Sequence, residues 1–389
     1  TLGVFYASLA RSADIWLVDL LQHQYGADLT FRIGQPGRNA FAGFSQTNET
    51  DADAAAMLPS DEYLRIPGVA AAARVGDFEA TISSATRIPY FRLLAVERTN
   101  FPQVAYFRED YAAEPLGELM NRLALVPNGI LLPRTTAGQM AIVPGDILPT
   151  RVHLQEDSWL QLNFKVAGLF DALPTVYPDD RPALVADLAY LELNTAGALP
   201  HTVWLRLAPG AVAEQVIREI RLHHVAPKEI RDLGQALATE VQRLERTGIF
   251  GILTVCFIAG VVLAVADLLV YSTYRLRQRG RANAILRALG VERGAILRTA
   301  LAEDAVTVAY SLTAGIACGV CAAVLYAPFY TLGKTDGPAI PPPIPLIDWQ
   351  RSDAIAVGVA LTLIVAEALA LLRLQRQRIF EALRMGAHV

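Results

Sequence analysis

The sequence predicts an α+β extracytoplasmic domain joined to an α-helical transmembrane bundle. Two observations predict this fold class: three long apolar runs lie near the C-terminal end, and the polar remainder mixes strand-like with helix-like segments. The chain has 389 residues, 53% of them hydrophobic. The first 246 residues carry 21 basic and 29 acidic side chains, and the other 143 carry 13 and 9. An acidic domain is thus joined to a basic membrane unit. The acidic domain has no basic stripe with interleaved aromatic residues, so its sequence does not indicate nucleic acid binding.

The first residues are apolar and predict the end of a preceding membrane helix over residues 1–12. We therefore expect a fourth span before residue 1. The extracytoplasmic domain is expected over 13–227. Its first elements are a helix at 11–25 that Gly26 ends, a strand at 27–33, a long loop at 34–58 and a short helix at 59–66.

The rest of this domain mixes strands and helices. Strand-like segments follow Ile66-Pro67-Gly68-Val69 as far as residue 97, and residues 116–125 form an amphipathic helix. Short strands with a turn at Gly145-Asp146 predict a β-rich subdomain at about 126–170. Further strands are expected at 183–186 and 202–207, and a helix at 211–222.

A polar helix is predicted over 228–246 as a stalk, because Leu233, Leu237, Val241 and Leu244 form one stripe. We expect it to continue unbroken into the first span. Spans are predicted at 247–274, 299–330 and 354–372, since apolar runs of this length cover roughly 28–35 Å. A proline-rich loop at 331–353 separates the last two, and 373–389 is a tail.

The segment 275–298 holds seven arginines and one acid, Glu292. Positively charged loops stay in the cytoplasm, so this segment and the tail lie inside. The domain at 13–227 then lies outside, and the protein is predicted to be multi-pass in the plasma (inner) membrane.

Motifs for catalysis and metal binding are lacking. Gly333-Lys334-Thr335 has Pro328 where a phosphate-binding loop needs glycine, and His223-His224 has no third ligand at metal spacing. There is no nucleophile motif. Cys256, Cys318 and Cys321 lie in apolar runs and favour packing. We expect no catalytic residue, metal or cofactor in this chain, and a membrane-anchored enzyme is disfavoured.

Two groups within the membrane unit are expected to make contacts. Glu303 and Asp304 lie within reach of Arg298, which predicts ion pairing at the inner surface. Gly315 and Gly319 lie on one helix face, in the spacing that allows close helix packing. Two interpretations of that face stay open: a dimer contact, or packing against a helix of the same subunit.

The arginine segment contains a short amphipathic elbow. Ile285, Leu286 and Leu289 form its apolar side, Arg281 and Arg287 lie around them, and Gly290 breaks the helix. One interpretation is a basic loop held on anionic lipid headgroups. The other is a docking surface for a cytoplasmic protein.

A resemblance to a known family supports the docking interpretation. Ala284-Ile285-Leu286-Arg287-Ala288-Leu289-Gly290, with Ile296-Leu297-Arg298 after it, resembles the signature of the FtsX-like/MacB-type permeases. The tail segment 379–384 resembles that family's closing motif. Tyr25-Gly26-Ala27-Asp28, Ile66-Pro67-Gly68-Val69 and Gly145-Asp146 resemble parts of its periplasmic domain. The family's Arg-Glu pair is replaced here by Ala282-Asn283.

The resemblance implies a type VII ABC permease subunit with four spans. The elbow would dock on a separate cytoplasmic ATPase that binds ATP and Mg, and the stalk would pass the motion outward by mechanotransmission. It implies a second permease, as homodimer or paralogue, contact with membrane lipid, and lipidic, amphiphilic or peptide cargo. A periplasmic or extracellular partner is a further candidate. The alternative is an FtsX-type regulator that activates an extracytoplasmic enzyme without transport.

Overall fold

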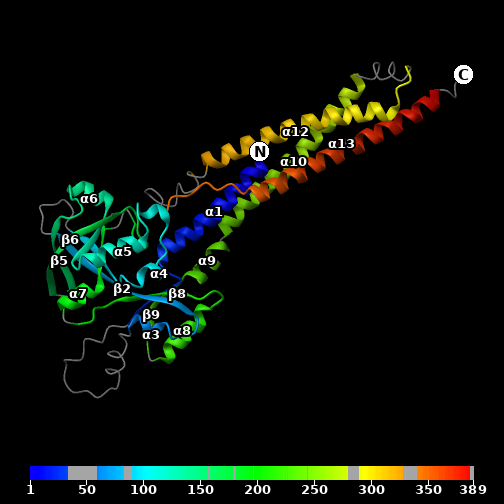
Figure 1. The fold of residues 1–389 in the computed structure, drawn as a ribbon. Helices are drawn as coiled ribbons and strands as arrows, with labels where there is room; N and C mark the ends of the chain where they lie inside the picture. The colour runs from blue at the N-terminus through cyan, green and yellow to red at the C-terminus, as the bar shows by residue number, and fades with distance from the viewer. Residues whose placement is uncertain are drawn as a thin grey trace. The chain divides into compact units, whose positions relative to one another are not determined.

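A computed structural model describes residues 1–33, 59–82, 90–155, 158–177, 181–195, 197–223, 225, 227–242, 244–278, 289–326, 329 and 340–385. The chain forms two compact units (Figure 1). The sheet unit comprises Leu17–Val241 and Thr335–Pro341, and the helical unit comprises Thr1–Trp16, Gln242–Lys334 and Pro342–Val389. Helix α1 (Leu2–Tyr25) supplies its first part to the helical unit and its second part to the sheet unit.

Within the described part of the chain, nine strands form one sheet. They are β1 (Leu29–Ile33), β2 (Val69–Ile82), β3 (Phe91–Val96), β4 (Gly129–Pro133), β5 (Ile147–Gln155), β6 (Ser158–Phe170), β7 (Ala183–Asp187), β8 (Thr202–Leu207) and β9 (Pro227–Asp232). Their order is β3-β7-β4-β6-β5-β2-β8-β1-β9, and β3 also pairs with β2. That extra pairing closes six strands, β2 to β7, into a ring. Most pairs are antiparallel, but β3–β7 and β4–β6 are parallel.

The ring encloses an apolar core. Alternate residues of each strand point inward, as the period of two in a strand requires. Phe78 and Ala80 of β2, Phe91 and Leu93 of β3 and Phe164 of β6 are all buried there. The residues that alternate with these point out of the ring. They pack against α4 (Phe101–Val104) and α5 (Leu116–Leu125) and form a second buried core.

The remaining strands, β8, β1 and β9, extend the sheet from β2. Helices α3 (Ser60–Tyr63) and α8 (Ala213–Leu222) supply buried side chains to a third core there, including Tyr63, Val216 and Ile220. Two further helices, α6 (Arg134–Met140) and α7 (Leu188–Thr195), complete the sheet unit and were not predicted from the sequence.

Most predicted elements of this unit are confirmed. The helix at 116–125 coincides with α5, and the strands predicted at 27–33, 183–186 and 202–207 correspond to β1, β7 and β8. The short strands predicted within 126–170 correspond to β4, β5 and β6. The region at about 126–170, predicted as a β-rich subdomain, contains β4, β5 and β6, which belong to the one sheet because β5 pairs with β2 and β4 pairs with β7. The predicted loop at 34–58 lies outside the described residues.

The predicted stalk helix over 228–246 needs correction. Lys228 and Arg231 pair with β1 as part of β9. Helix α9 (Leu233–Val241) begins only after Asp232, whose Oδ1 accepts the N–H of Gly234 at 2.8 Å and of Gln235 at 3.2 Å. Aspartate favours this N-cap position, which fixes the helix start. Gln242 is a turn residue before α10 (Leu244–Gln278), so α9 and α10 are assigned as separate helices.

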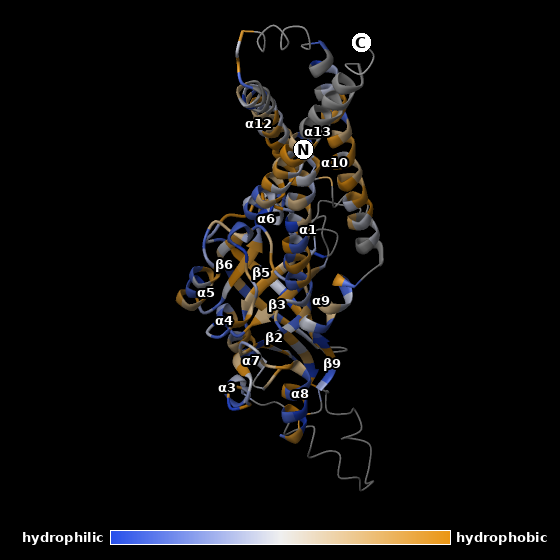
Figure 2. Cartoon of the chain, turned by 90° about the vertical axis from the view of Figure 1, so that its right-hand side faces the viewer, coloured by the Kyte–Doolittle hydropathy of each residue, from blue (hydrophilic) through white to orange (hydrophobic). Residues whose placement is uncertain are grey.

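The helical unit contains α10, α12 (Arg293–Tyr326) and α13 (Trp349–Met385). Three stretches are long and apolar enough to cross a membrane: Phe250–Arg275, Ala305–Tyr326 and Trp349–Leu369. Figure 2 shows hydrophobic residues along α10 and α12. Apolar side chains of all three helices are exposed rather than buried in the chain, with Leu263 of α10 at 70%, Val306 of α12 at 70% and Leu361 of α13 at 63%. Apolar surface on this scale needs an apolar surrounding, which favours a membrane over a buried core.

The proline-rich loop is described only from residue 340, and Pro342–Asp348 has no regular secondary structure. Helix α13 begins at Trp349, before the predicted start of the last span at 354, and runs through much of the predicted tail to Met385. The Gly333-Lys334-Thr335 triplet lies outside the described residues.

Candidate functional site

The predicted elbow is described only at its end. Arg281, Ile285, Leu286 and Arg287 lie outside the described residues. Leu289 is 75% exposed. Gly290, three residues before α12 begins, has a φ of +90°, the left-handed region that glycine adopts without strain.

Helices α10 and α12, which flank the elbow, are joined by an ion pair. Arg275 Nη1 lies 3.4 Å from Glu303 Oε2, and the Arg275 guanidinium also lies 5.6 Å from the centre of the Tyr271 ring. Arg298, the predicted partner of Glu303, donates from Nε to the carbonyl of Gly294 at 3.4 Å. The structure therefore joins Glu303 to the preceding helix, and it does not describe the Asp304 side chain.

Gly315 and Gly319 face the start of α1. A Cβ on Gly319 would lie 2.7 Å from the carbonyl oxygen of Thr1 and 2.9 Å from Val4 Cβ, and one on Gly315 would lie 3.2 Å from the Thr1 nitrogen. Any larger side chain would push α1 away. In this structure the small-residue face thus packs within the subunit, the second of the two interpretations.

The sheet unit contains a second candidate site, where the chain enters and leaves it. We call it the joint, and define it as residues 17–28 of α1 and the turn that follows, the loop 105–111, and residues 233–237 of α9. Gly26 ends α1 with a φ of +77°, and a Cβ there would overlap the Trp204 ring. Only glycine fits both constraints.

Asp28 ties the parts of the joint together. Its carboxylate accepts hydrogen bonds from the Tyr106 hydroxyl and from the N–H of Leu207 at 2.8 Å. Its backbone carbonyl accepts the N–H of Leu233, the first residue of α9, at 3.0 Å. Burial and the bond to Asp28 raise the pKa of Tyr106 to about 12, so its hydroxyl stays protonated and keeps donating.

The loop 105–111 braces α1 at two more points. Arg108 Nη1 lies 2.8 Å from Asp19 Oδ2. His23 is 1% exposed, with Nε2 at 2.9 Å from the Val176 carbonyl and Nδ1 at 3.0 Å from the Tyr111 hydroxyl. The carbonyl can only accept, so Nε2 carries the proton and Nδ1 accepts from Tyr111. Burial lowers the pKa of His23, with the Arg108 charge acting in the same direction, which favours this neutral form.

Apolar packing completes the joint. Leu17 and Leu21 of α1 are buried against Leu233 of α9, with Ala236 and Leu237 beside them. The helix that enters the sheet unit and the helix that leaves it are therefore packed on each other. Sequence reasoning missed this contact, although the aspartate that directly follows Tyr-Gly-Ala was a usable signal of a polar anchor.

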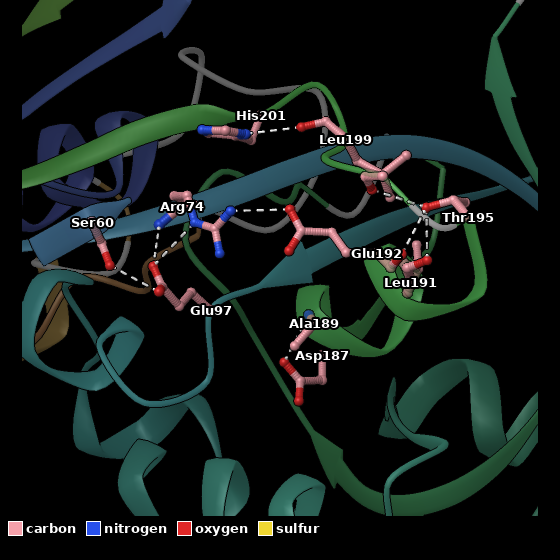
Figure 3. A network of polar contacts seen from close by, with 11 residues as sticks. Ser60, Arg74, Glu97, Asp187, Ala189, Leu191, Glu192, Thr195, Leu199 and His201 are labelled. Atoms are coloured by element: carbon pink, nitrogen blue, oxygen red, sulfur yellow. Dashed lines mark hydrogen bonds and ion pairs between the residues drawn. The ribbon is translucent and has the colours of Figure 1, made fainter. Parts of the chain in front are cut away.

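A polar cluster pins β2 to the helices around it (Figure 3). Arg74 Nη1 donates to Glu192 of α7 at 3.0 Å, and Arg74 N–H donates to Glu97 at 3.1 Å. Glu97 also accepts the Ser60 hydroxyl of α3 at 2.8 Å. Nearby His201 is 6% exposed and its Nδ1 lies 2.9 Å from the Leu199 carbonyl, so Nδ1 donates. These contacts join β2 to α3 and α7.

Chemistry other than contact and support is not evident in the described residues. None of them form a group of three or more His, Cys, Asp or Glu side chains placed to hold a metal ion. His223 is exposed at the end of α8, and His224 lies outside the described residues.

Comparisons with known proteins add little. No family model and no curated protein matches the chain. Among solved structures, the extracellular domain of the noncanonical ABC-type transporter YknZ from Gram-positive bacteria is similar at 11% identity, covering 52% of this chain and 98% of that one, with a TM-score of 0.29. A domain of a protein described as a permease from Porphyromonas gingivalis is similar at 15% identity over 52% and 85%, with a TM-score of 0.27. These scores are too low to establish a shared fold.

Proposed function

We propose that this chain is a permease subunit of an ABC system of the FtsX-like/MacB type. It would couple ATP hydrolysis by a separate cytoplasmic ATPase to movement of its extracytoplasmic sheet unit. The ATPase would hold ATP and Mg, and a second permease would complete the complex. The cargo would be lipidic, amphiphilic or peptide material that is exported or extracted.

The observation that carries the proposal is the arginine segment 275–298 between two helices long enough to cross a membrane. Its charge favours the cytoplasmic side. Its apolar residues include Leu289, which is 75% exposed and has no membrane-spanning role in a loop. Leu289 also follows Ile285 by four residues, the spacing of apolar anchors in a helix that binds a partner's groove.

The joint supports transmission of movement to the sheet unit. Residues of α1 and α9 pack on each other, and Asp28 bonds to both β8 and the start of α9. A closely packed, hydrogen-bonded connection deforms little. A displacement of either helix would therefore be passed to the sheet as a rigid movement.

Co-expression of the full chain with a candidate ABC ATPase from the same organism tests the proposal. The ATPase should co-purify with the wild-type chain and be lost when Ile285 and Leu289 are both replaced by Asp, because two buried charges would oppose docking. Leu125→Asp is the matched control, since Leu125 is an 82% exposed leucine in the sheet unit. Unchanged co-purification of the double variant would exclude the elbow as the docking site.

A transport assay on the same complex separates the two roles that the resemblance implies. ATP-dependent release of a labelled lipid or lipopeptide from proteoliposomes would support a transporter. ATP-dependent activation of an added extracytoplasmic hydrolase, with no release of cargo, would support the regulator instead.

A further inference from the structure

Helix α1 is bound to the segment that leads into α13 through a pair of hydrogen bonds. The Ser12 hydroxyl donates to the Leu346 carbonyl at 3.1 Å and accepts the Leu346 N–H at 2.9 Å. One side chain thus satisfies both backbone groups of a residue in a stretch without regular secondary structure. Ser12 is 7% exposed, so water competes poorly for these bonds.

An ion pair lies beside these hydrogen bonds. Arg11 Nη1 is 3.5 Å from Asp348 Oδ1, and the Asp348 side chain is only 5% exposed. Asp348 is also the N-cap of α13, because Oδ1 accepts the N–H of Arg351 at 3.0 Å. Its negative charge there favours the helix dipole as well. The residue that starts α13 is therefore the residue that binds α1.

Close packing continues along α1 toward its start. A Cβ on Gly3 would lie 2.6 Å from Ile355 Cγ2 of α13, so the two helix backbones approach closely there. The polar contact at Ser12 and the apolar contact at Gly3 are therefore nine residues apart on one helix. Contacts spread over that length oppose both sliding and rotation of α1 on α13.

We propose that Ser12 and Asp348 are positioning residues that make α1 and the start of α13 move as one body. The contrast is with the other connection to the sheet unit, where α9 and α10 are assigned as separate helices with a turn at Gln242. Motion of α13 would then be passed to α1, whose second part belongs to the sheet unit. We call the contacts of Ser12 with Leu346 and of Arg11 with Asp348 the clasp. Its role in transmitting motion rests on the proposed function, but its geometry does not.

Hydrogen exchange at the Leu346 amide tests the clasp directly in the full chain in lipid nanodiscs. Ser12→Ala should raise exchange at that amide about tenfold, the effect of losing one net hydrogen bond with its neighbours retained. Ser8→Ala is the matched control, because Ser8 lies one turn earlier, is equally buried, and its hydroxyl has no hydrogen-bond partner among the described residues. Unchanged exchange in Ser12→Ala would overturn the clasp.

The one-body inference has its own measurement in the complex with the ATPase. Protection of the Leu346 amide should be the same in the nucleotide-free and ATP-bound complexes, and loss of protection on ATP binding would overturn it. In the wild-type complex the distance between labels on α1 and the start of α13 should stay constant on ATP binding. The double variant Ser12→Ala, Asp348→Asn should still co-purify the ATPase but show an ATP-driven change in that distance at least twofold larger than in the wild type. An equal change in both would also overturn the inference, whereas failure of the wild-type chain to bind an ATPase would count against the proposed function alone.

Discussion

At the scale of single residues, a few buried polar groups determine how the chain enters its sheet unit. Asp28 is the clearest case, since its side chain and backbone together accept three hydrogen bonds from three different parts of the fold. Groups of this kind contribute little net free energy when satisfied, but they are costly when a partner is removed. Their value lies in fixing one arrangement of the elements around them.

Replacing Asp28 with Asn tests this role. The amide keeps the size of the side chain but has one acceptor oxygen, so either Tyr106 or Leu207 loses its bond. We expect the free energy of unfolding to fall by about 1–3 kcal/mol, measured by urea denaturation followed by tryptophan fluorescence. Tyr106→Phe should cost less, because the charged Asp28 carboxylate still accepts from Leu207, whereas Asp28→Asn removes one bond and also the charge that strengthens the other. Equal losses for both variants would show that the Leu207 bond is unimportant.

His23 and His201 predict a pH dependence of stability. Burial lowers the pKa of both, so the unfolded chain binds protons at a higher pH than the folded chain does. Stability should therefore fall as the pH drops below about 6.5, the pKa of unfolded histidine. Thermal melting at pH 7.5 and 5.5 measures this.

A matched variant separates the histidines from the carboxylates. His201→Asn keeps a donor for the Leu199 carbonyl and His23→Gln keeps one for Val176. The double variant should lose less stability than the wild-type chain between pH 7.5 and 5.5. An equal loss would assign the pH dependence to the ion pairs.

At the scale of elements, what the sequence predicts well is what local pattern determines. The apolar runs located the three candidate spans, and the spacing of Leu116, Leu119 and Leu123 located α5. The stalk prediction failed at 228–232 because the apolar stripe begins only at Leu233, and the Asp232 N-cap marks that residue as the helix start. Closure of the ring by β2 and β3, and the packing of α1 on α9, depend on contacts between distant residues and carry no local pattern.

Gly26 is where an element boundary can be tested. Gly26→Ala combines a left-handed backbone with overlap on the Trp204 ring, so we expect a loss of roughly 2–4 kcal/mol. Gly210→Ala is the matched control: its φ is +82°, but no atom lies within 4 Å of the added Cβ, so only the backbone cost of about 1 kcal/mol applies. Denaturation of both variants gives the comparison. Equal losses would mean that the contact with Trp204 relaxes at no cost.

At the scale of the whole molecule, the charge of the arginine segment predicts which side of the membrane each part occupies. The three cysteines, Cys256, Cys318 and Cys321, all lie on α10 or α12, away from the loops. Single cysteines can therefore be introduced at Leu125 and Leu289, which are 82% and 75% exposed, after the natural ones are replaced by Ala.

A membrane-impermeant maleimide added to intact spheroplasts should label Leu125→Cys and leave Leu289→Cys unlabelled until the membrane is permeabilised. The expectation follows because translocating seven arginines is far less favourable than retaining them inside. The label on each variant is measured by gel shift, and labelling of the denatured protein serves as the control for reactivity. Labelling of Leu289→Cys from outside would invert the topology, and an ATPase in the cytoplasm could then not reach the elbow.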